Sequence, residues 1–282
     1  MNGDNHYDVR FKPRIGDSLI LPILGVFVGL FGFGELGVHG FEHDAAHHVK
    51  AKLSGDHATI SVRTGLDLGL LQGDIREVVI RGSQFSTPGL PLFTEPERPK
   101  DGKLRLLRMD LKDFYLRGLH MDRLEASIPD CRFDLGLALR KREIRLSTSG
   151  SGTGAVTIRD RDLEAFVLTK FHDIKKASIK ISQGRIHVSG HGQFLIFDTD
   201  FTVDAKLVIL DGTKLALDDA TILFDGQPTD ELSRKALLQT LNPVVDLNVD
   251  LQLYDAIHVW KVDLGEGFLR ASGSTVIPVR PQ

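Results

Sequence analysis

The sequence contains a single cysteine among its 282 residues, Cys131, and a single tryptophan, Trp260. One cysteine cannot form a disulfide within the chain, so burial and hydrogen bonds must stabilise the fold. The net charge of −3 provides no overall basic surface of the kind that nucleic-acid-binding proteins carry. These absences exclude a disulfide scaffold and argue against a nucleic-acid partner.

The motifs of familiar enzyme classes are also absent. There is no Gly-x-Ser-x-Gly nucleophile elbow and no His-Glu-x-x-His zinc motif. Cys131 precedes Arg132, which could activate a thiol, but a half-buried structural cysteine is the simpler interpretation. Asp198, Asp200 and Asp204 could bind calcium, yet a solvated strand face explains alternating aspartates equally well. We therefore expect no enzymatic activity, no cofactor and no metal.

One long apolar run is present, from Ser18 to Gly34, and it contains no charged residue. Its length is at the short end of the range for a membrane span. Three basic residues between positions 10 and 14 precede it, and no Lys or Arg follows before Lys50. This asymmetry places residues 1–17 in the cytoplasm and the rest of the chain outside. We interpret residues 18–40 as an uncleaved single-pass anchor; a cleaved signal peptide and a buried core helix are the alternatives.

A helix is expected next, from Phe41 to Leu53. His39, His43 and His47 are spaced four residues apart, and histidines at that spacing on a helix can share a metal ion. A polar helix face near the lipid headgroups explains them too. We adopt that second interpretation, because no cysteine or distant carboxylate motif completes a site.

Alternating apolar and polar residues predict strands through most of the remaining chain. In a first β-rich half, residues 41–148, the predicted strands are 59–63, 74–82, 103–117, 120–129, 132–139 and 143–148. Four prolines between Ser86 and Asp101 predict a loop there. Residues 149–154 read Ser-Gly-Ser-Gly-Thr-Gly, which predicts a flexible joint to a second half, residues 155–282.

In the second half, apolar stripes predict helices at Thr157–Asp173 and Pro228–Leu241, the latter capped by Thr229. An antiparallel meander from Ser178 to Gly226 separates them and includes a long strand from Gln193 to Leu210. The final strands are predicted at 247–254, 258–263 and 268–276.

This half contains an internal repeat. Residues 177–190 and 259–273 each comprise an alternating strand, a Gly turn, a second alternating strand and Ser-Gly, and each follows a helix. Two helices delivered by the same supersecondary unit are expected to lie on one face of one sheet.

The predicted fold class is α+β: a long curved antiparallel sheet covered on one face by a few amphipathic helices and preceded by the membrane helix. Short helices leave part of an apolar sheet face uncovered, which produces a groove suited to acyl chains; an ordinary filled core is the alternative. The residues expected to line the groove are Leu163, Phe166, Val167, Phe171, Phe194, Ile196, Phe201, Val203, Leu237, Leu241 and Trp260.

The order of these elements resembles the LmeA-like family. The resemblance is carried by the Ile-Lys-Ile-x-x-Gly-x-Ile-x-Val-x-Gly hairpin at 179–190, the Asp-Gly-Thr-Lys-Leu turn at 211–215 and Asn242-Pro243 after the second helix. It is best from Thr153 to Pro278, with a weaker echo from Phe41 to Gly82. These bacterial envelope proteins bind phospholipid and are related in shape to tubular lipid-binding domains.

The resemblance implies phospholipid binding by an exported, membrane-tethered domain without enzyme chemistry. We therefore expect a membrane-anchored, extracytoplasmic lipid-binding protein whose partners are phospholipid and the membrane. A non-enzymatic envelope scaffold with a filled core and a protein partner is the alternative.

Overall fold

The structure is a computed structural model that describes residues 59–65, 73–87, 98–137, 146–182, 184–194 and 197–277. The anchor expected at 18–40, the helix expected at 41–53 and the histidines at 39, 43 and 47 lie outside the described residues. Among the helices that are described, none has the length and apolar character needed to cross a membrane. The anchor therefore stays a prediction.

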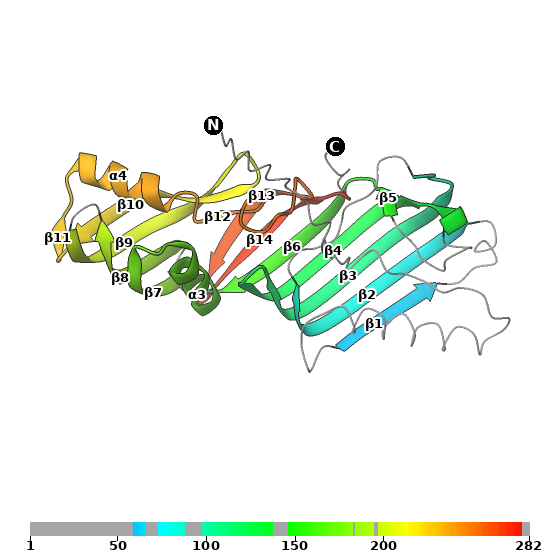
Figure 1. Ribbon diagram of the computed structural model, residues 1–282, viewed down its shortest axis with the longest axis horizontal. Coiled ribbons are helices and arrows are strands. Elements are labelled where there is room, and N and C mark those ends of the chain that lie inside the picture. Colours follow the sequence, from blue (N-terminus) through cyan, green and yellow to red (C-terminus); the bar gives the residue numbers. More distant parts are fainter. Residues whose placement is uncertain are drawn as a thin grey trace, which may run out of the picture.

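Strands dominate the fold and form two sheets that follow one another along the long axis of the molecule (Figure 1). The larger sheet has the strand order β1-β2-β3-β4-β6-β14-β13, with the short β5 beside β4. Its strands are β1 (Thr59–Gly65), β2 (Asp74–Thr87), β3 (Gly102–Leu116), β4 (Leu119–Phe133), β5 (Leu146–Thr148), β6 (Gly152–Arg159), β13 (Ile257–Gly265) and β14 (Phe268–Thr275).

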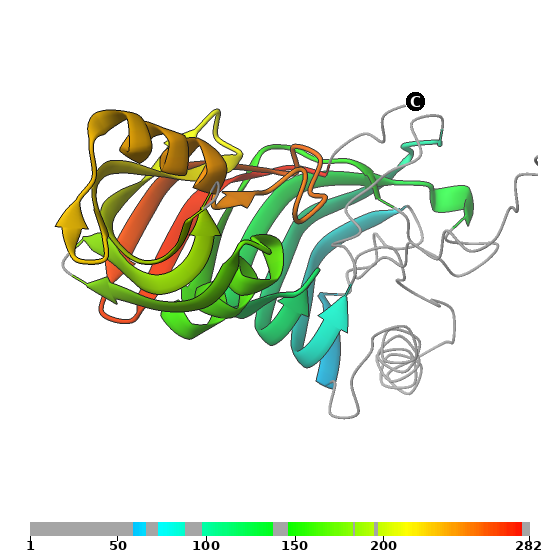
Figure 2. The same ribbon diagram turned by 60° about the vertical axis from the view of Figure 1, so that its left-hand side comes forward.

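The smaller sheet has the order β11-β10-β9-β8-β7, with β12 paired to β10. Its strands are β7 (Ile174–Ser182), β8 (Arg185–Phe194), β9 (Phe197–Leu210), β10 (Lys214–Phe224), β11 (Gln227–Pro228) and β12 (Val245–Asp246). Two helices accompany the sheets: α3 (Asp160–Lys170) contacts β4, β6 and β7, and α4 (Glu231–Leu241) lies over β10 (Figures 1 and 2).

The two faces of the larger sheet differ in polarity. One face bears ion pairs between neighbouring strands, such as Arg108 to Glu77 at 3.0 Å and Arg123 to Asp110 at 3.0 Å. Cross-strand pairs of opposite charge favour this register and keep that face in water. The alternate residues are buried, and among them the rings of Phe85 and Phe114 stack with centroids 5.0 Å apart. The apolar interior therefore lies on a single face.

The predicted mainly-β character with few helices is confirmed, but the arrangement departs from one antiparallel sheet. Strand β2 runs parallel to β3, and all other pairings are antiparallel in the part of the chain that the structure describes. The two hairpins of the internal repeat are β7–β8 and β13–β14, and they belong to different sheets. The repeated unit therefore does not build one sheet, although both helices contact strands of the smaller sheet, α3 at β7 and α4 at β10.

Three expected boundaries also change. Helix α3 begins at Asp160, because residues 152–159 pair as β6 with β4 and β14. Asp230 caps α4 by accepting a 2.9 Å hydrogen bond from the Ser233 amide, whereas the Thr229 hydroxyl donates to the Ile222 carbonyl. The strand expected from Gln193 to Leu210 is divided between β8 and β9, which pair with each other.

Glycines in the expected joint and in the repeat allow close strand approach. At Gly152, an added Cβ would lie 2.3 Å from the Ser127 carbonyl oxygen, so part of the predicted joint is a tightly paired strand. In the repeat, a Cβ on Gly190 would lie 2.3 Å from the Lys176 oxygen, and one on Gly273 would lie 2.4 Å from the His258 oxygen. The recurring Ser-Gly thus marks a position where two backbones nearly touch, beside a β-bulge in each hairpin.

We expect Gly273→Ala to lower the free energy of unfolding by about 1–3 kcal/mol, because the new methyl group meets backbone that cannot rotate away. Ser272→Ala, a neighbouring change on the opposite face of β14, is the control and should stay within about 0.5 kcal/mol of the wild type. Urea unfolding measures both. Equal stabilities for the two variants would contradict the close-approach explanation.

Candidate functional site: an apolar cavity beneath a cover segment

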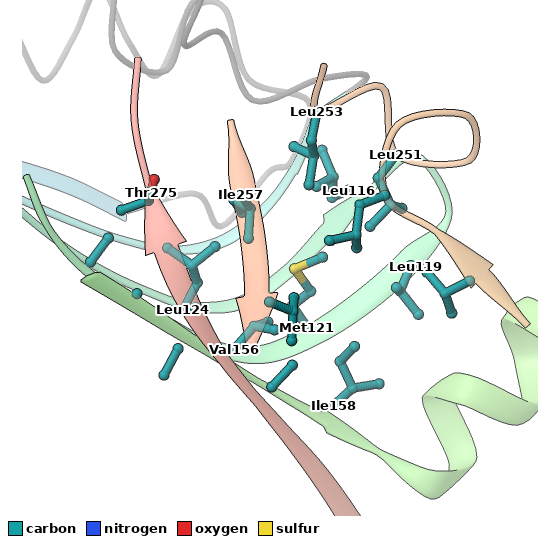
Figure 3. A pocket seen from close by; sticks show the side chains of 18 of the residues that line it. Leu116, Leu119, Met121, Leu124, Val156, Ile158, Leu251, Leu253, Ile257 and Thr275 are labelled. Carbon is teal, nitrogen blue, oxygen red and sulfur yellow. The ribbon is translucent and has the colours of Figure 1, made fainter. Parts of the chain in front are cut away.

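A cavity with a volume of about 60 Å³ lies on the apolar face of the larger sheet. Apart from Glu125 and Thr275, its lining side chains are apolar or absent. The sheet contributes residues from β3, β4, β6, β13 and β14, and Figure 3 shows their side chains directed into one space. The labelled lining residues are Leu116, Leu119, Met121, Leu124, Val156, Ile158, Leu251, Leu253, Ile257 and Thr275.

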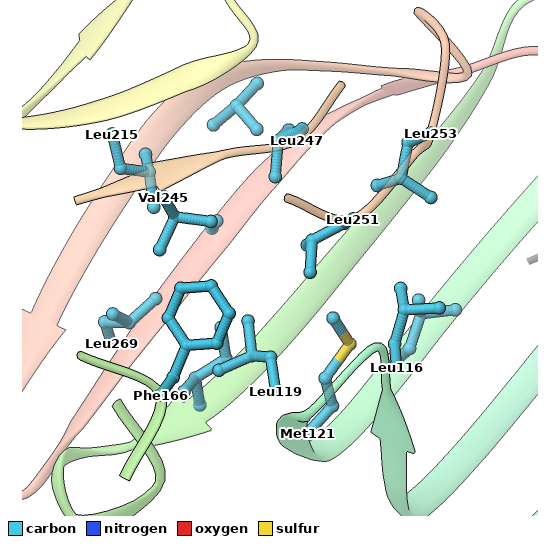
Figure 4. Packing of buried hydrophobic residues seen from close by; sticks show 14 of the residues in the cluster. Leu116, Leu119, Met121, Phe166, Leu215, Val245, Leu247, Leu251, Leu253 and Leu269 are labelled. Atoms are coloured by element: carbon cyan, nitrogen blue, oxygen red, sulfur yellow. The ribbon is translucent and has the colours of Figure 1, made fainter. Parts of the chain in front are cut away.

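The side of the cavity opposite the sheet is formed by residues 243–256, which we call the cover segment. Its inward side chains, Val245, Leu247, Leu251 and Leu253, are buried and line the cavity (Figure 4). The sequence predicts a strand over 247–254, but the segment folds as turns. The Asp246 carboxylate accepts hydrogen bonds from the next turn's amides, and residues 252, 254 and 255 have positive φ. Turn chemistry of this type interrupts an alternating pattern.

The cover segment is bonded to both sheets. The Leu247 amide donates to the Thr213 carbonyl at 2.9 Å, which connects the segment to the start of β10. The Val276 amide donates to the Ala256 carbonyl at 2.9 Å, which connects it to the chain just after β14. These bonds hold the apolar side chains of the segment over the larger sheet.

Lys170, the last residue of α3, provides a further attachment. Its ammonium group donates to the carbonyl oxygens of Pro243 at 2.8 Å and Val244 at 3.3 Å, and to the Asp250 carboxylate at 2.6 Å. Asp250 also accepts the Asp246 amide at 2.8 Å. One partly buried cation therefore joins α3 to both ends of a loop in the cover segment. Charge-assisted hydrogen bonds of this kind are stronger than neutral ones.

His120 attaches the other end of α3 to the sheet. The His120 side chain is 11% exposed, and its Nε2 lies 2.8 Å from Asp113 and its Nδ1 2.9 Å from Asp162 of α3. The Asp162 contact lacks the geometry of a well-directed hydrogen bond and is an ion pair when His120 is protonated. Burial lowers the pKa of His120, but Asp162 and Asp113 outweigh that effect, and the pKa is raised above its ordinary value.

The predicted lining residues occupy several places. The groove residues of α3, β9 and α4 are buried in the core: Leu163, Phe166, Val167, Phe201, Val203, Leu237 and Leu241. Phe171 is partly buried against this core, and Trp260 is 56% exposed on the outer side of β13. The side chain of Phe194 and all of Ile196 lie outside the described residues. None of the nine that the structure describes lines the central cavity, but Figure 4 shows Phe166 beside Leu119 and Leu269, facing Val245.

Two further hollows have different linings. One, of about 780 Å³, opens beneath α4 and includes the predicted Leu237, but Asp173, Asp198 and Asp225 also line it. The other, of about 510 Å³, lies on the charged outer face beside Trp260. Both are larger than the central cavity. Their polar linings suit acyl chains less well, because burying carboxylates against hydrocarbon is unfavourable.

The remaining candidate groups have structural explanations. Cys131 is fully buried, and burial raises the pKa of its thiol to about 12, which confirms the structural interpretation. Asp198 pairs with Lys175 at 2.9 Å, Asp200 pairs with His191 at 2.8 Å, and Asp204 pairs with Arg185 and His187. These aspartates thus belong to a charged outer face. Within the described residues there is no group of three metal-ligating side chains.

Sequence reasoning missed the residues that line the cavity. The predicted strand at 120–129 contains Met121 and Leu124, but the sequence alone does not show that they face an open space. Two small residues that also line the cavity, Ala126 of β4 and Gly154 of β6, were a usable signal, because small side chains on a buried face leave room.

Comparison with known proteins identifies one match. A family model described as LmeA-like phospholipid-binding matches residues 100–274, well over half of the chain. The matched range contains β3 to β13, nearly all of β14 and the cover segment. No curated protein and no solved structure matches.

We expect the His120 contacts to make stability depend on pH. Because the folded pKa is raised, the stabilisation is complete below the unfolded pKa of about 6.5 and is lost as the pH rises through the folded value. The difference in urea midpoint between the wild type and His120→Gln should therefore be larger at pH 5.5 than at pH 9. In the Asp162→Asn background, the pH dependence of this difference in urea midpoint should be weaker. A difference that does not vary with pH would contradict this account of the His120 contacts.

Proposed function

The chain belongs to the LmeA-like phospholipid-binding family, and from that premise we propose that it holds phospholipid acyl chains between the larger sheet and the cover segment. The observation that supports the proposal most directly is the almost wholly apolar lining of the cavity. Each methylene group moved from water into such a lining contributes about 0.8 kcal/mol. A chain of a dozen carbons would thus gain on the order of 10 kcal/mol before the costs of ordering.

The cavity is too small for a whole acyl chain. One water-sized sphere requires about 10–15 Å³ on the same measure, so 60 Å³ accommodates roughly four to six. Lipid entry therefore requires the cover segment to separate from the sheet. The segment has little regular structure, and Lys170 ties it to α3, so the Lys170 contacts set part of the energy needed for opening.

We further propose that the protein acts by binding, without catalysis, and that residues 18–40 anchor it with the lipid-binding part outside the cytoplasm. The apolar run and its flanking basic residues support the anchor and its orientation. The narrowness of the closed cavity favours one second candidate, an envelope scaffold with a filled core and a protein partner.

Native mass spectrometry and lipid extraction of the full chain released from membranes test the lipid proposal. The expected result is phospholipid bound at about one per chain. A protein that carries no lipid and takes none up from phospholipid vesicles would favour the scaffold. The mass of the bound molecule also identifies which phospholipid it is.

Filling the cavity should remove the lipid without unfolding the protein. Val156 lies in β6 and lines the cavity, so Val156→Phe places a ring in the space that the acyl chain would use. We expect bound lipid to fall at least tenfold, with the free energy of unfolding changed by no more than about 1–3 kcal/mol. Val208→Phe on β9, away from the cavity, should retain its lipid. Equal lipid content in both variants would place the lipid elsewhere.

Removing the Lys170 contacts should accelerate lipid exchange. A hydrogen bond to a charged group contributes about 1.5–3 kcal/mol, so loosening the cover segment by that amount corresponds to roughly tenfold or more in rate. We expect Lys170→Met to exchange fluorescent phospholipid with vesicles at least tenfold faster, whereas Lys176→Met, at an exposed lysine of β7, should not. Unchanged exchange by Lys170→Met would show that the cover segment does not limit entry.

A further inference from the structure

Three large apolar side chains are exposed on turns next to the cavity. Leu210, at the end of β9, is 45% exposed, and Val249 and Tyr254, in the cover segment, are 72% and 42% exposed. We call these three residues the docking rim. Exposed apolar side chains that gather in one place are typical of interaction sites.

Backbone contacts bring the three turns together. The Thr213 amide bonds back to the Leu210 carbonyl, and the Thr213 carbonyl accepts from Leu247 of the cover segment. The Leu253 amide in turn donates to the Leu247 carbonyl, which places the turn that carries Tyr254 beside the one that carries Val249. Figures 1 and 2 both show the β9–β10 turn and the cover segment side by side on one edge of the molecule.

The cover segment is apolar on two sides. Leu247, Leu251 and Leu253 face the cavity and explain one set of apolar side chains. Val249 lies between Leu247 and Leu251 in the sequence, Tyr254 follows Leu253, and both are exposed. The cover segment thus has one apolar side toward the cavity and one toward solvent. Under the proposed function, lipid must pass this segment to enter the cavity.

We propose that the docking rim inserts into the surface of a phospholipid bilayer and positions the cover segment over the lipid to be taken up. This inference rests on the proposed function, because it supplies the source from which the cavity is filled. Leu210, Val249 and Tyr254 would enter the boundary between headgroups and acyl chains, where apolar and aromatic side chains are stabilised.

The charged residues around the docking rim indicate which lipid headgroups it would contact. Asp211 and Asp255 are exposed beside it, and Lys214 pairs with Asp211 at 3.9 Å. The rim therefore has no excess of positive charge to attract anionic headgroups. Docking should occur on zwitterionic phosphatidylcholine and change little between 50 and 500 mM salt, because apolar insertion is not screened.

A bilayer fits the docking rim better than a folded partner. Three side chains on separate turns offer far less than the roughly 800 Å² that each partner buries in a stable protein interface. A protein tethered by the proposed anchor needs only weak contact, since the anchor would already hold it at the membrane. Separate protruding side chains can each enter a fluid surface without a matching shape.

The position of residue 249 can be read by fluorescence, because Trp260 is the only tryptophan and lies on the outer side of β13. In the full chain reconstituted into phosphatidylcholine vesicles, Trp260→Phe combined with Val249→Trp places the sole indole in the docking rim. We expect a blue-shifted emission and at least twofold quenching by phosphatidylcholine brominated on its acyl chains. The wild type, which reports from Trp260, should show little quenching.

A loss-of-contact variant tests the consequence for lipid uptake. Leu210→Ser combined with Val249→Ser should slow lipid uptake from the vesicles at least tenfold, with the amount of lipid bound at equilibrium unchanged. Leu232→Ser, at a 79% exposed leucine of α4, is the matched control and should behave like the wild type.

The outcomes separate this inference from the proposed function. Absence of quenching at position 249 in a protein that still carries phospholipid would overturn the docking rim and leave the proposed function standing. Quenching at position 249 in a protein that carries no phospholipid would support the docking rim and contradict the proposed function. Equal quenching at positions 249 and 260 would also overturn the inference, because insertion would not be specific to the rim.

Discussion

The bridge that the cover segment makes between the two sheets is the interaction on which the rest of the structure depends. The larger sheet has a continuous apolar face, and its charged cross-strand pairs fix that face as the inner one. A sheet of this kind must be covered. Residues 243–256 cover the part over β6 and β14 while bonding to β10 on one side and to the chain after β14 on the other. A few backbone hydrogen bonds and the Lys170 contacts hold the cover segment in place. These polar contacts are few for the area of apolar sheet that the segment covers.

This arrangement joins stability to function. A core filled by interdigitating side chains has no room for a ligand, and a core left open would expose hydrocarbon to water. The small residues at Ala126, Gly154 and Gly273 leave a narrow space, and the cover segment lies over it. Helix α3 is attached at both ends. Near its start Asp162 contacts His120 of the larger sheet, and at its end Lys170 bonds to the cover segment. Helix α3 thus supports the elements on both sides of the cavity.

Most strands, both hairpins of the repeat and the two helices were predictable, because alternation and apolar stripes depend on local sequence. The parallel β2–β3 pair, the division into two sheets and the cavity were not, because they depend on which strand meets which across long separations. Gly190 and Gly273 illustrate the limit. Their shared Ser-Gly context indicated a repeated hairpin, but the approach of the Lys176 and His258 carbonyls that requires glycine appears only in three dimensions. Residues 247–254 of the cover segment were predicted as a strand because Leu247, Leu251 and Leu253 mimic alternation, while Asp246 folds them into turns.

The central claim is that acyl chains lie between the larger sheet and the cover segment. Photocrosslinking with a phosphatidylcholine that carries a diazirine at the end of one acyl chain, followed by peptide mapping, tests it most directly. The account predicts adducts on the two sides of the cavity, at residues such as Met121 of β4 and Leu251 of the cover segment. Adducts confined to the hollow beneath α4, to the outer face around Trp260 or to residues 18–40 would contradict it.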